Sequence, residues 1–472
     1  MLSTLAFRNL LVKRGRSLFL LLGYGLGVGV MIVLLSVGEA MLNQARDVSL
    51  VGGGEITVLP EGIDVEALRT GGVSALFFTI DRARFVARQG LGGPRHAGLV
   101  TAVAPAIEQK LVYLRTGSET IAVRAGGEIP SRSTELGSGI RVLTGTWSDS
   151  PADSAYIRPS AQQLYDEIDH FHIPQVEDST WGEWHYFNIV TGPDEWWYVS
   201  LLVGGRLPSG RWGGQVLVTH RREDGIYERF AGAEPSNRIA FDTSRADLVL
   251  GASGVTQREG VYRIRVEIPD LTMNLTVQPT RYNYFPPVQL KEGEYQSGYA
   301  VAALRGIASG RVCPRGMCRE IAKAPAYHDH NWGVWRDVSW EWGAASGPGL
   351  SFLYGQVKAP DSTGSLEPFF FSIVDSLGIR QVLRARAISY HGEQPVANGG
   401  KILAPRNFDF VAARDRDTIR VSVEVREAVA TLMSTGSFQR YFLQMRGQFT
   451  LRGALDGKPV VETGNGFFET WR

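Results

Sequence analysis

The sequence predicts a mainly β protein in which two antiparallel β units follow one another along the chain. Glycine (55 residues) and proline (22 residues) are plentiful, and long amphipathic helical patterns are scarce after the N-terminus. This composition favours an antiparallel protein with many tight turns. Short runs of strand composition recur at even spacing without crossover helices between them, which is typical of a barrel or a sandwich.

Length and charge limit the number of domains and the class of partner. The 472 residues suffice for roughly three domains at about 150 residues each. Lysine and arginine (49) nearly balance aspartate and glutamate (48), so the chain has no large basic field to hold nucleic acid. We therefore expect no nucleic-acid partner.

The first element is an apolar segment from Ser17 to about Gly38, without a charged residue before Glu39. A run of about 20 apolar residues can cross a bilayer as a helix, so we predict a transmembrane helix over 17–38. The basic residues lie before this segment: Arg8, Lys13, Arg14 and Arg16. By the positive-inside rule, residues 1–16 are then cytoplasmic, and the chain is a single-pass protein of the cytoplasmic (inner) membrane with its bulk in the periplasm.

A cleaved signal peptide is the alternative interpretation of this segment, with Ser36 and Gly38 near the cleavage site. The apolar stretch is longer than the roughly 7–15 residues of a signal-peptide core, which favours an uncleaved anchor. Both interpretations export the remainder of the chain.

Residues 48–150 predict a small α+β domain. Strand composition is found at 55–59 and within 111–124, and residues 81–89 suit a short helix. A stretch rich in glycine and serine after residue 126 is typical of a loop. We place the domain boundary near residue 150.

The remaining residues predict two β units, 151–335 and 336–472, after a short helix near 159–169. Residues 184–190 and 195–203 are strand-like and are separated by Thr-Gly-Pro-Asp, which predicts a hairpin. Further strands are expected at 214–221, 226–230, 247–250, 261–268, 271–278, 338–343, 350–357, 367–375, 379–390, 406–412, 418–427, 440–452 and 459–471.

The stretch richest in ionisable and aromatic side chains lies near the predicted junction of the two units. It reads Tyr327-His328-Asp329-His330-Asn331-Trp332-Gly333 and is followed by Trp335, Trp340, Glu341 and Trp342. If 327–332 is extended, Tyr327, Asp329 and Asn331 lie on one face, and the two histidines with Trp332 lie on the other. The acid and the histidines would then serve different environments.

Acid catalysis is one interpretation of this stretch, with Asp329 as the catalytic residue. Desolvation in an apolar pocket lined by tryptophan disfavours the ionised carboxylate, so Asp329 can act as a general acid. Protonation of an isolated alkene gives a carbocation, and indole faces stabilise positive charge. Such a site suits hydration or cyclisation of an isoprenoid-like substrate, with these predicted ligand-binding residues nearby: Tyr327, Trp332, Trp340 and Trp342.

Two other interpretations stay open. His328 and His330 form a His-x-His pair that can bind one Zn²⁺, but a catalytic zinc needs a third protein ligand, and the sequence does not single one out among His172, His185, His220 and His391. Alternatively, the polar residues brace the backbone and the tryptophans form a core. We predict no metal and no cofactor.

Cys313 and Cys318 enclose a short loop, Cys-x4-Cys. Outside the cytoplasm, a disulfide closing such a loop is expected. The spacing differs from the Cys-x-x-Cys of redox-active sites, and two cysteines are too few for a zinc ribbon.

Residues from about 180 to 472 resemble the hydroxyneurosporene synthase (carotenoid 1,2-hydratase) and AttH-like family. The likeness is carried by Glu195-Trp196-Trp197-Tyr198, by Asp329-His330-Asn331-Trp332-Gly333 with Trp340-Glu341-Trp342, and by the closing Gly464-Asn465-Gly466-Phe467-Phe468-Glu469. The resemblance implies two tandem lipocalin-like barrels and a hydrophobic, often polyene, ligand. It places the suspected acid on Asp329 and implies these pocket or framework residues: Glu195, Trp197, His330, Asn331 and Trp332.

The N-terminal third resembles the start of MacB/FtsX-like ABC transporter permeases. The best matches are Leu5-Ala6-Phe7-Arg8-Asn9-Leu10, Gly54-Glu55-Ile56-Thr57-Val58-Leu59 and Val103-Ala104-Pro105-Ala106-Ile107. A second apolar run of about 18 residues is missing, so the chain departs from these permeases and is not by itself a transport path.

Together these features predict a membrane-anchored, lipocalin-like protein that binds a hydrophobic isoprenoid, polyene or lipid and hydrates or cyclises it. The alternative is a non-catalytic, ligand-binding accessory component of a MacB-like ABC export or lipid-handling system, with transporter ATPase and permease subunits as partners.

Overall fold

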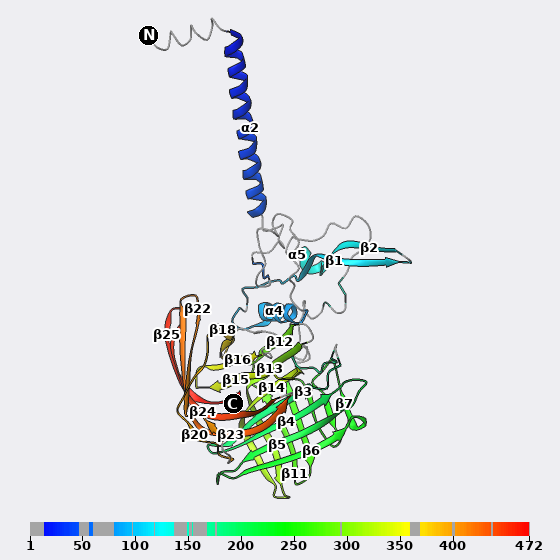
Figure 1. Ribbon diagram of the computed structural model, residues 1–472, viewed down its shortest axis with the longest axis vertical. Helices are drawn as coiled ribbons and strands as arrows, with labels where there is room; N and C mark the ends of the chain where they lie inside the picture. Colours follow the sequence, from blue (N-terminus) through cyan, green and yellow to red (C-terminus); the bar gives the residue numbers. More distant parts are fainter. Residues whose placement is uncertain are drawn as a thin grey trace. The chain divides into compact units, whose positions relative to one another are not determined.

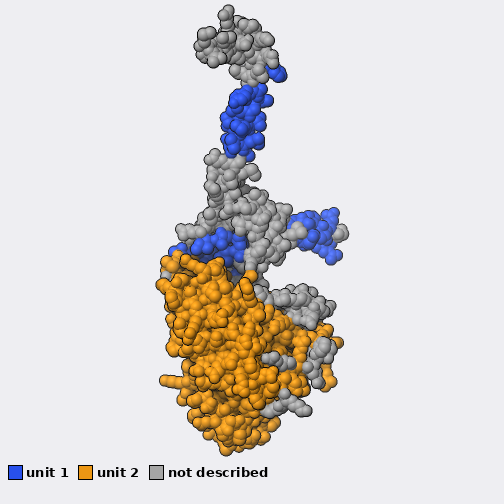
Figure 2. Space-filling model, turned by 60° about the vertical axis from the view of Figure 1, so that its left-hand side comes forward, with its two compact units in different colours: residues 1–83, 101–157 blue, residues 84–100, 158–472 orange. Residues whose placement is uncertain are grey.

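The computed structural model describes residues 14–46, 56–59, 80–96, 98–117, 119–135, 149–150, 153, 168–174, 177–292, 295–358, 369–398, 402–435 and 438–471. The chain divides into two compact units, residues 1–83 with 101–157 (unit 1) and residues 84–100 with 158–472 (unit 2), coloured in Figure 2. Unit 1 mixes helices and strands, whereas unit 2 is almost entirely β.

Unit 1 holds a long helix, a two-stranded hairpin and a short helix. These are α2 (Arg14–Arg46), β1 (Ala106–Thr116) with β2 (Glu119–Glu128), and α5 (Pro130–Glu135). The hairpin contains the strands expected within 111–124. Residues 56–59, which were predicted as a strand, have no regular secondary structure.

The prediction of a single-pass membrane protein is wrong. Helix α2 covers the predicted segment, but no helix in the described part of the chain is both long and apolar enough to cross a bilayer. The sequence argument counted Gly23, Gly25, Gly27 and Gly29 as part of one apolar run, although glycine adds no apolar side chain. The predicted inner-membrane location depended on that helix and is therefore wrong as well. That prediction had the N-terminus inside and the bulk of the chain in the periplasm.

Twelve strands of unit 2 form one antiparallel sheet, here called the first barrel. They are β3 (Trp181–Gly192), β4 (Glu195–Gly205), β5 (Trp212–Arg221), β6 (Tyr227–Pro235), β7 (Ile239–Phe241), β8 (Leu248–Leu250), β9 (Ser253–Arg258), β10 (Val261–Ile268), β11 (Leu271–Pro279), β12 (Phe285–Glu292), β13 (Tyr295–Pro314) and β14 (Arg319–Val334). The hydrogen-bonded order is β6-β5-β4-β3-β14-β13-β11-β10-β9-β8-β7, with β12 on β13. The last strand, β14, therefore lies beside the first, β3.

Nine strands form the second barrel, drawn in yellow to red in Figure 1. They are β15 (Ser339–Ser346), β16 (Ser351–Lys358), β17 (Phe370–Asp375), β18 (Gly378–Ala385), β19 (Ser389–His391), β22 (Asn407–Arg414), β23 (Asp417–Thr435), β24 (Phe438–Leu455) and β25 (Lys458–Trp471). Pairing of β18 with β22 and of β15 with β25 closes a ring of antiparallel strands. The short strands β20 (Gln394–Pro395) and β21 (Leu403–Ala404) pair separately.

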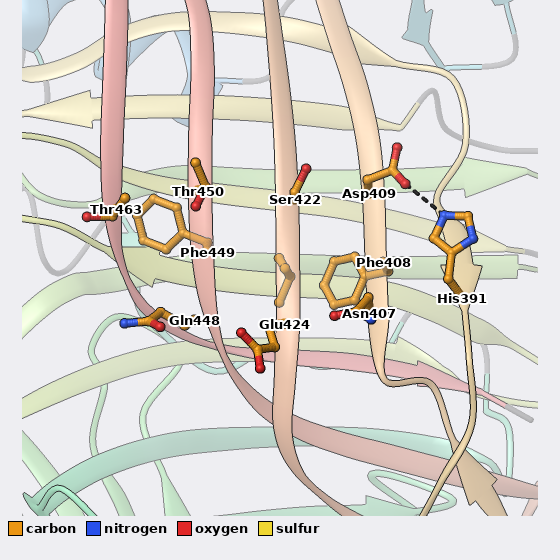
Figure 3. A pocket seen from close by; sticks show the side chains of 11 residues that line it. His391, Asn407, Phe408, Asp409, Ser422, Glu424, Gln448, Phe449, Thr450 and Thr463 are labelled. Atoms are coloured by element: carbon orange, nitrogen blue, oxygen red, sulfur yellow. Dashed lines mark hydrogen bonds and ion pairs between the residues drawn. The ribbon is translucent and has the colours of Figure 1, made fainter.

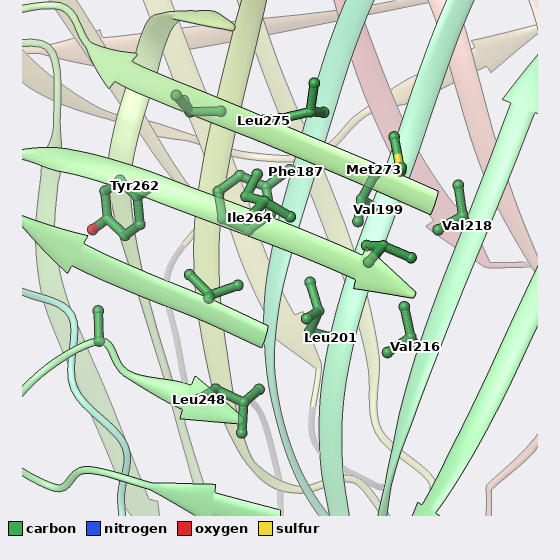
Figure 4. Close-up of a cluster of buried hydrophobic side chains, with 14 of the residues drawn as sticks. Phe187, Val199, Leu201, Val216, Val218, Leu248, Tyr262, Ile264, Met273 and Leu275 are labelled. Atoms are coloured by element: carbon green, nitrogen blue, oxygen red, sulfur yellow. The ribbon is translucent and has the colours of Figure 1, made fainter. Parts of the chain in front are cut away.

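Each barrel has its own apolar interior, because alternate residues of every strand point inward. On β4, for example, Trp197, Val199 and Leu201 belong to the core of the first barrel. Figure 4 shows part of this core, with Phe187, Ile264 and Met273 packed between strands. The predicted mainly β architecture with two barrel-like sheets is thus confirmed.

Two further features belong to unit 2. From residue 84 onward, helix α4 (Ile80–Gly92) is part of this unit, and its Phe85 packs against the core of the first barrel. At the tip of the β13–β14 hairpin, Cys313 and Cys318 form a disulfide. The expected helix near 159–169 lies mostly outside the described residues.

The packing of β13 on β14 predicts that Gly298→Ala destabilises the protein. Gly298 is the cross-strand partner of Trp332, and an added Cβ would lie 2.3 Å from Cε2 of that indole. Because Trp332 is buried on all sides, such overpacking should lower the free energy of unfolding by about 1–3 kcal/mol. Urea unfolding followed by tryptophan fluorescence measures the loss.

Gly192→Ala is the control for this prediction, because an added Cβ there would lie 3.5 Å from Cβ and 3.9 Å from N of Glu195, which are ordinary van der Waals distances. Stability should therefore change little. Equal unfolding midpoints for Gly298→Ala and the wild type would contradict the packing argument.

Candidate functional site

Strand β14 carries polar residues on both of its faces. Tyr327 packs in a core cluster shared by the two barrels, whereas Trp332 packs in the core of the first barrel. Asp329 and Asn331 lie on the Tyr327 side, and His328 and His330 lie on the Trp332 side. The expectation that the acid and the histidines face different environments is confirmed.

Aromatic side chains fill the layer between the two barrels, here called the interbarrel layer. It contains Tyr186, Trp196, Tyr198, Phe285, Tyr299, Tyr327, Trp342, Phe370 and Phe467, with Trp184, Tyr227, Trp335 and Trp340 partly buried at its margin. Strands from both sheets contribute, because each barrel turns one outer face towards the other. This layer is a second apolar environment outside the two barrel cores.

Asp329 lies in the interbarrel layer with 3% of its surface exposed. Its Oδ2 accepts a hydrogen bond from the Tyr327 hydroxyl at 2.7 Å, and its Oδ1 accepts one from the Asn331 amide at 2.7 Å. The Trp342 indole in turn donates to the Tyr327 oxygen at 3.0 Å. Two neutral donors therefore hold this carboxyl group in one orientation.

A second carboxyl group, Glu469 on β25, enters the same layer and is 8% exposed. The Trp340 indole donates to its Oε2 at 2.9 Å. Gln444 is the cross-strand neighbour of Glu469 and donates to the Tyr186 hydroxyl at 3.2 Å. Tyr186 is itself directly opposite Asp329 on β3, so Tyr186 and Gln444 connect the surroundings of the two acids.

Burial shifts the pKa of both acids upward. Desolvation raises the pKa of Asp329 to about 6, against the hydrogen bonds from Tyr327 and Asn331 and the nearby histidines, which lower it. Desolvation and the negative charge of Asp329 raise the pKa of Glu469 to about 8, although Trp340 and Gln444 lower it. At neutral pH, Glu469 therefore holds a proton more firmly than Asp329 does.

The remaining predicted site residues fall in three places. Trp340 and Trp342 lie in the interbarrel layer with Asp329. Trp197, Trp332 and His330 lie inside the first barrel. Glu195 lies at the edge of that barrel. The structure thus does not bring all of the predicted ligand-binding residues into one pocket.

Glu195 belongs to a charged network at one end of the first barrel. Its carboxylate pairs with His220 Nε2 at 3.0 Å and with Arg319 at 2.5 Å. The His220 ring stacks on Trp197 with 3.5 Å between ring centroids. A surface hollow of about 410 Å³ lies beside Glu195 and Arg319, away from Asp329.

Another hollow, of about 450 Å³, lies on the outside of the second barrel over β22 to β25. Figure 3 shows that Asp409 and His391, which form an ion pair at 2.8 Å, stand at its margin. Its lining includes none of the predicted site residues, so its size does not identify the chemical site.

Inside the first barrel, His330 joins a polar cluster that the sequence did not reveal. Asp169, fully buried, lies 2.5 Å from His330 Nδ1 and 2.9 Å from His328 Nε2. Burial would raise the pKa of Asp169, but the neighbouring histidines hold it well below its ordinary value. Asp169, His185 and His330 form the group among the described residues whose donor atoms could hold a metal ion.

Sequence reasoning missed Glu469, Tyr186 and Gln444 in the interbarrel layer and Asp169 and Glu183 inside the first barrel. It named His185 only as one of four possible zinc ligands. Glu469 ends the Gly-Asn-Gly-Phe-Phe-Glu stretch noted above, and its position among apolar residues was a usable signal. Asp169 precedes a His-Phe-His sequence, but no local pattern indicates that its carboxylate reaches β14. Its partners lie about 160 positions away in the chain.

Raised acid pKa values predict that stability falls with rising pH. Because the folded pKa of Glu469 (about 8) exceeds the ordinary value of 4.5, the folded state binds the extra proton between these values. Its contribution is fully present below about pH 4.5 and is lost as the pH rises through 8. Each extra proton changes the free energy of unfolding by at most about 1.4 kcal/mol per pH unit.

Urea denaturation at intervals between pH 5 and 8 measures this dependence. In Glu469→Gln, the free energy of unfolding should fall less steeply with pH than in the wild type, by the contribution of about one proton. Glu424→Gln, on the exposed face of the second barrel, should leave this slope unchanged. Parallel curves for Glu469→Gln and the wild type would show that Glu469 titrates normally.

No known protein-family profile matches the sequence, and no curated protein matches it. Several solved structures align with about two thirds of the chain. An AttH-like protein from Nitrosomonas europaea is 14% identical, with a TM-score of 0.45, over 64% of this chain and 96% of its own. Kievitone hydratase from Nectria haematococca is 15% identical, with a TM-score of 0.42, over 64% and 94%. The protein CghA is 11% identical, with a TM-score of 0.48, over 66% and 96%.

None of these three is an ABC transporter permease, so they give no support to the predicted resemblance of the N-terminal third. Likeness at this level of identity does not assign an activity.

Proposed function

We propose that unit 2 binds a hydrophobic small molecule of the isoprenoid, polyene or lipid class in the interbarrel layer and hydrates or cyclises an alkene in it. The observation that carries this proposal is the pair of buried carboxyl groups, Asp329 and Glu469, held by aromatic donors within one apolar layer. Buried carboxyl groups are costly to retain in such a layer, which supports a chemical role for them.

Glu469 is the proton donor in this mechanism. Its raised pKa keeps the carboxyl group protonated at neutral pH, and the Trp340 indole orients it through Oε2. The sequence analysis assigned the acid role to Asp329. The environment of Glu469 suits that role better.

Asp329 is the complementary base. Both of its oxygens accept hydrogen bonds, from Tyr327 and Asn331, and this arrangement favours the ionised carboxylate. A carboxylate beside a developing cation both stabilises the positive charge and accepts a proton from an attacking water.

In hydration, the alkene π electrons take the Glu469 proton to form a C–H bond, and the other alkene carbon becomes a carbocation. A water oxygen then forms a C–O bond to that carbon, and the proton it loses goes to Asp329. Proton exchange returns the two carboxyl groups to their starting states, so the net change is addition of one water. In cyclisation, a second alkene of the same substrate attacks the cation instead, and the cyclised cation then loses a proton to Asp329, which gives an isomer of the substrate.

The aromatic side chains of the layer suit the intermediate as well as the substrate. Trp342 and Tyr299 meet edge to face at 4.9 Å between ring centroids, and Phe370 stacks with Tyr299 at 5.9 Å. Such faces attract a cation without reacting with it. The sequence resemblance to hydroxyneurosporene synthase agrees with this class of reaction. The predicted ABC transporter partners stay a prediction.

The test uses the purified full chain with squalene or lycopene in detergent micelles and H₂¹⁸O. Mass spectrometry should detect a product heavier by one water that contains ¹⁸O, or an isomer of equal mass if the alkene cyclises. Glu469→Gln and Asp329→Asn should each lower the rate about 100-fold or more, since each removes an acid–base group.

Glu424→Gln is the matched control, because this exposed carboxylate lies on β23, outside the interbarrel layer, and its rate should equal that of the wild type. Full turnover by both Glu469→Gln and Asp329→Asn, with fold checked by circular dichroism, would rule out acid–base catalysis by this pair.

A further inference from the structure

A fully buried polar cluster lies inside the first barrel, on the face of β14 opposite Asp329. Its three central residues come from three separate segments: Asp169 from residues 168–174, His185 from β3, and His330 from β14. Their side chains have 0% exposed surface, although the surrounding core is apolar. The mechanism proposed above uses none of them.

We propose that Asp169, His185 and His330 form a structural binding site for a divalent transition-metal ion. The proposal is independent of the function proposed for the interbarrel layer. Two imidazoles and one carboxylate are a donor set found in known zinc and iron sites, and zinc serves here as the reference ion.

The donor atoms have the spacing that one ion requires. Asp169 Oδ1 lies 2.5 Å from His330 Nδ1 and 3.7 Å from His185 Nδ1. All three residues offer donor atoms within 4.8 Å of one another. Ligands of a tetrahedral zinc lie roughly 3.3 Å apart, given metal–ligand distances of about 2.0 Å, so small side-chain movements suffice.

Hydrogen bonds from residues around the three ligands orient their side chains, as is common in metal sites. The other oxygen of Asp169, Oδ2, accepts a hydrogen bond from the Tyr262 hydroxyl at 2.5 Å and contacts His328 Nε2 at 2.9 Å. This leaves Oδ1 directed at the cluster. Carboxylates held in this way are typical of metal ligands.

His330 has an outer partner of the same kind. Its Nε2 lies 3.1 Å from Glu183 Oε1, while its Nδ1 faces Asp169. A carboxylate beyond the distal nitrogen fixes the tautomer and the ring orientation of a metal-bound histidine. Glu183 is itself fixed by the backbone N–H and the ring of His172.

His185 gives the independent sign that a ligand is missing from this cluster. The side chain is fully buried, yet neither ring nitrogen makes a hydrogen bond to a described residue. Its polar neighbours are Asp169, whose Oδ1 lies 3.7 Å from Nδ1, and the backbone of Ala246. Leaving a buried imidazole without a partner is unfavourable, and a bound ion would satisfy it.

The ion would cross-link the segment 168–174 to two neighbouring strands of the sheet. Ile168 and Phe171 of that segment already pack in the core of the first barrel. An ion bound to the folded state only stabilises it by mass action. Metal loading should therefore be visible in stability as well as in metal content.

The experiment uses the full chain, purified without a histidine tag, stripped with a chelator and titrated with Zn²⁺. Elemental analysis after gel filtration should find about one zinc per chain, and zinc should raise the thermal unfolding midpoint. Co²⁺ in place of zinc should give the visible absorption of a tetrahedral nitrogen and oxygen site.

His185→Phe is the decisive variant, because it removes a ligand without removing a hydrogen bond and places an apolar ring beside Phe171 and Phe187. The variant should fold without metal, bind zinc at least 100-fold more weakly and show no thermal shift. Glu183→Gln should retain one zinc but bind it roughly 10-fold more weakly, as expected for an outer partner.

His391→Ala is the matched control, since His391 also pairs with an aspartate but is exposed on the second barrel. Its zinc content and thermal shift should equal those of the wild type. The proposal is overturned if stripped wild-type protein binds no zinc and shows no Co²⁺ spectrum, or if His185→Phe binds zinc as tightly as the wild type.

Discussion

The two-residue period of β14 is the constraint on which both proposed sites depend. Adjacent residues of a strand must point to opposite faces, so Asp329 and His330 cannot share an environment. Because β14 lies between β3 and β13 in the first barrel, one face closes that barrel and the other meets the second barrel. A shift of the strand by one residue would exchange the carboxylate with the histidines and bury each among the wrong partners.

Burial tends to raise the pKa of the carboxyl groups on both faces of β14, but the groups that contact each carboxyl decide the direction of its pKa shift. In the interbarrel layer, the hydrogen-bond donors to the two acids are all neutral, so burial prevails and the pKa values of the acids rise. These donors are Tyr327, Asn331, Trp340 and Gln444. Inside the first barrel, Asp169 is equally buried, but imidazole groups surround it and hold its pKa down. Asp329 and Asp169 have similar burial, yet their pKa values shift in opposite directions because of what touches them.

The second barrel contributes residues to the proposed site as well as to the fold. Glu469 and Trp340 belong to it, and Trp342 donates to Tyr327 across the layer. Further bonds join the barrels, including Trp196 Nε1 to Glu427 at 3.3 Å and Arg221 to Glu427 at 3.0 Å. Neither barrel alone contains the acid pair, which explains why a search for one self-contained motif around residue 330 did not find Glu469.

Local pattern alone determined most strands of the two barrels, although not β12 and β13, because hydrophobic alternation and turn chemistry act over a few residues. It also determined the turn at 191–194 and the division of β14 into two faces. It failed at the N-terminus, where the glycines were counted within one apolar run. Only the tertiary structure could join Asp169 to His330, or Glu469 to Asp329, since these contacts span about 140 to 160 residues of chain and leave no local periodicity. The sequence therefore determined which residues share a face, whereas the pairing of strands and the packing of the barrels decided which faces meet.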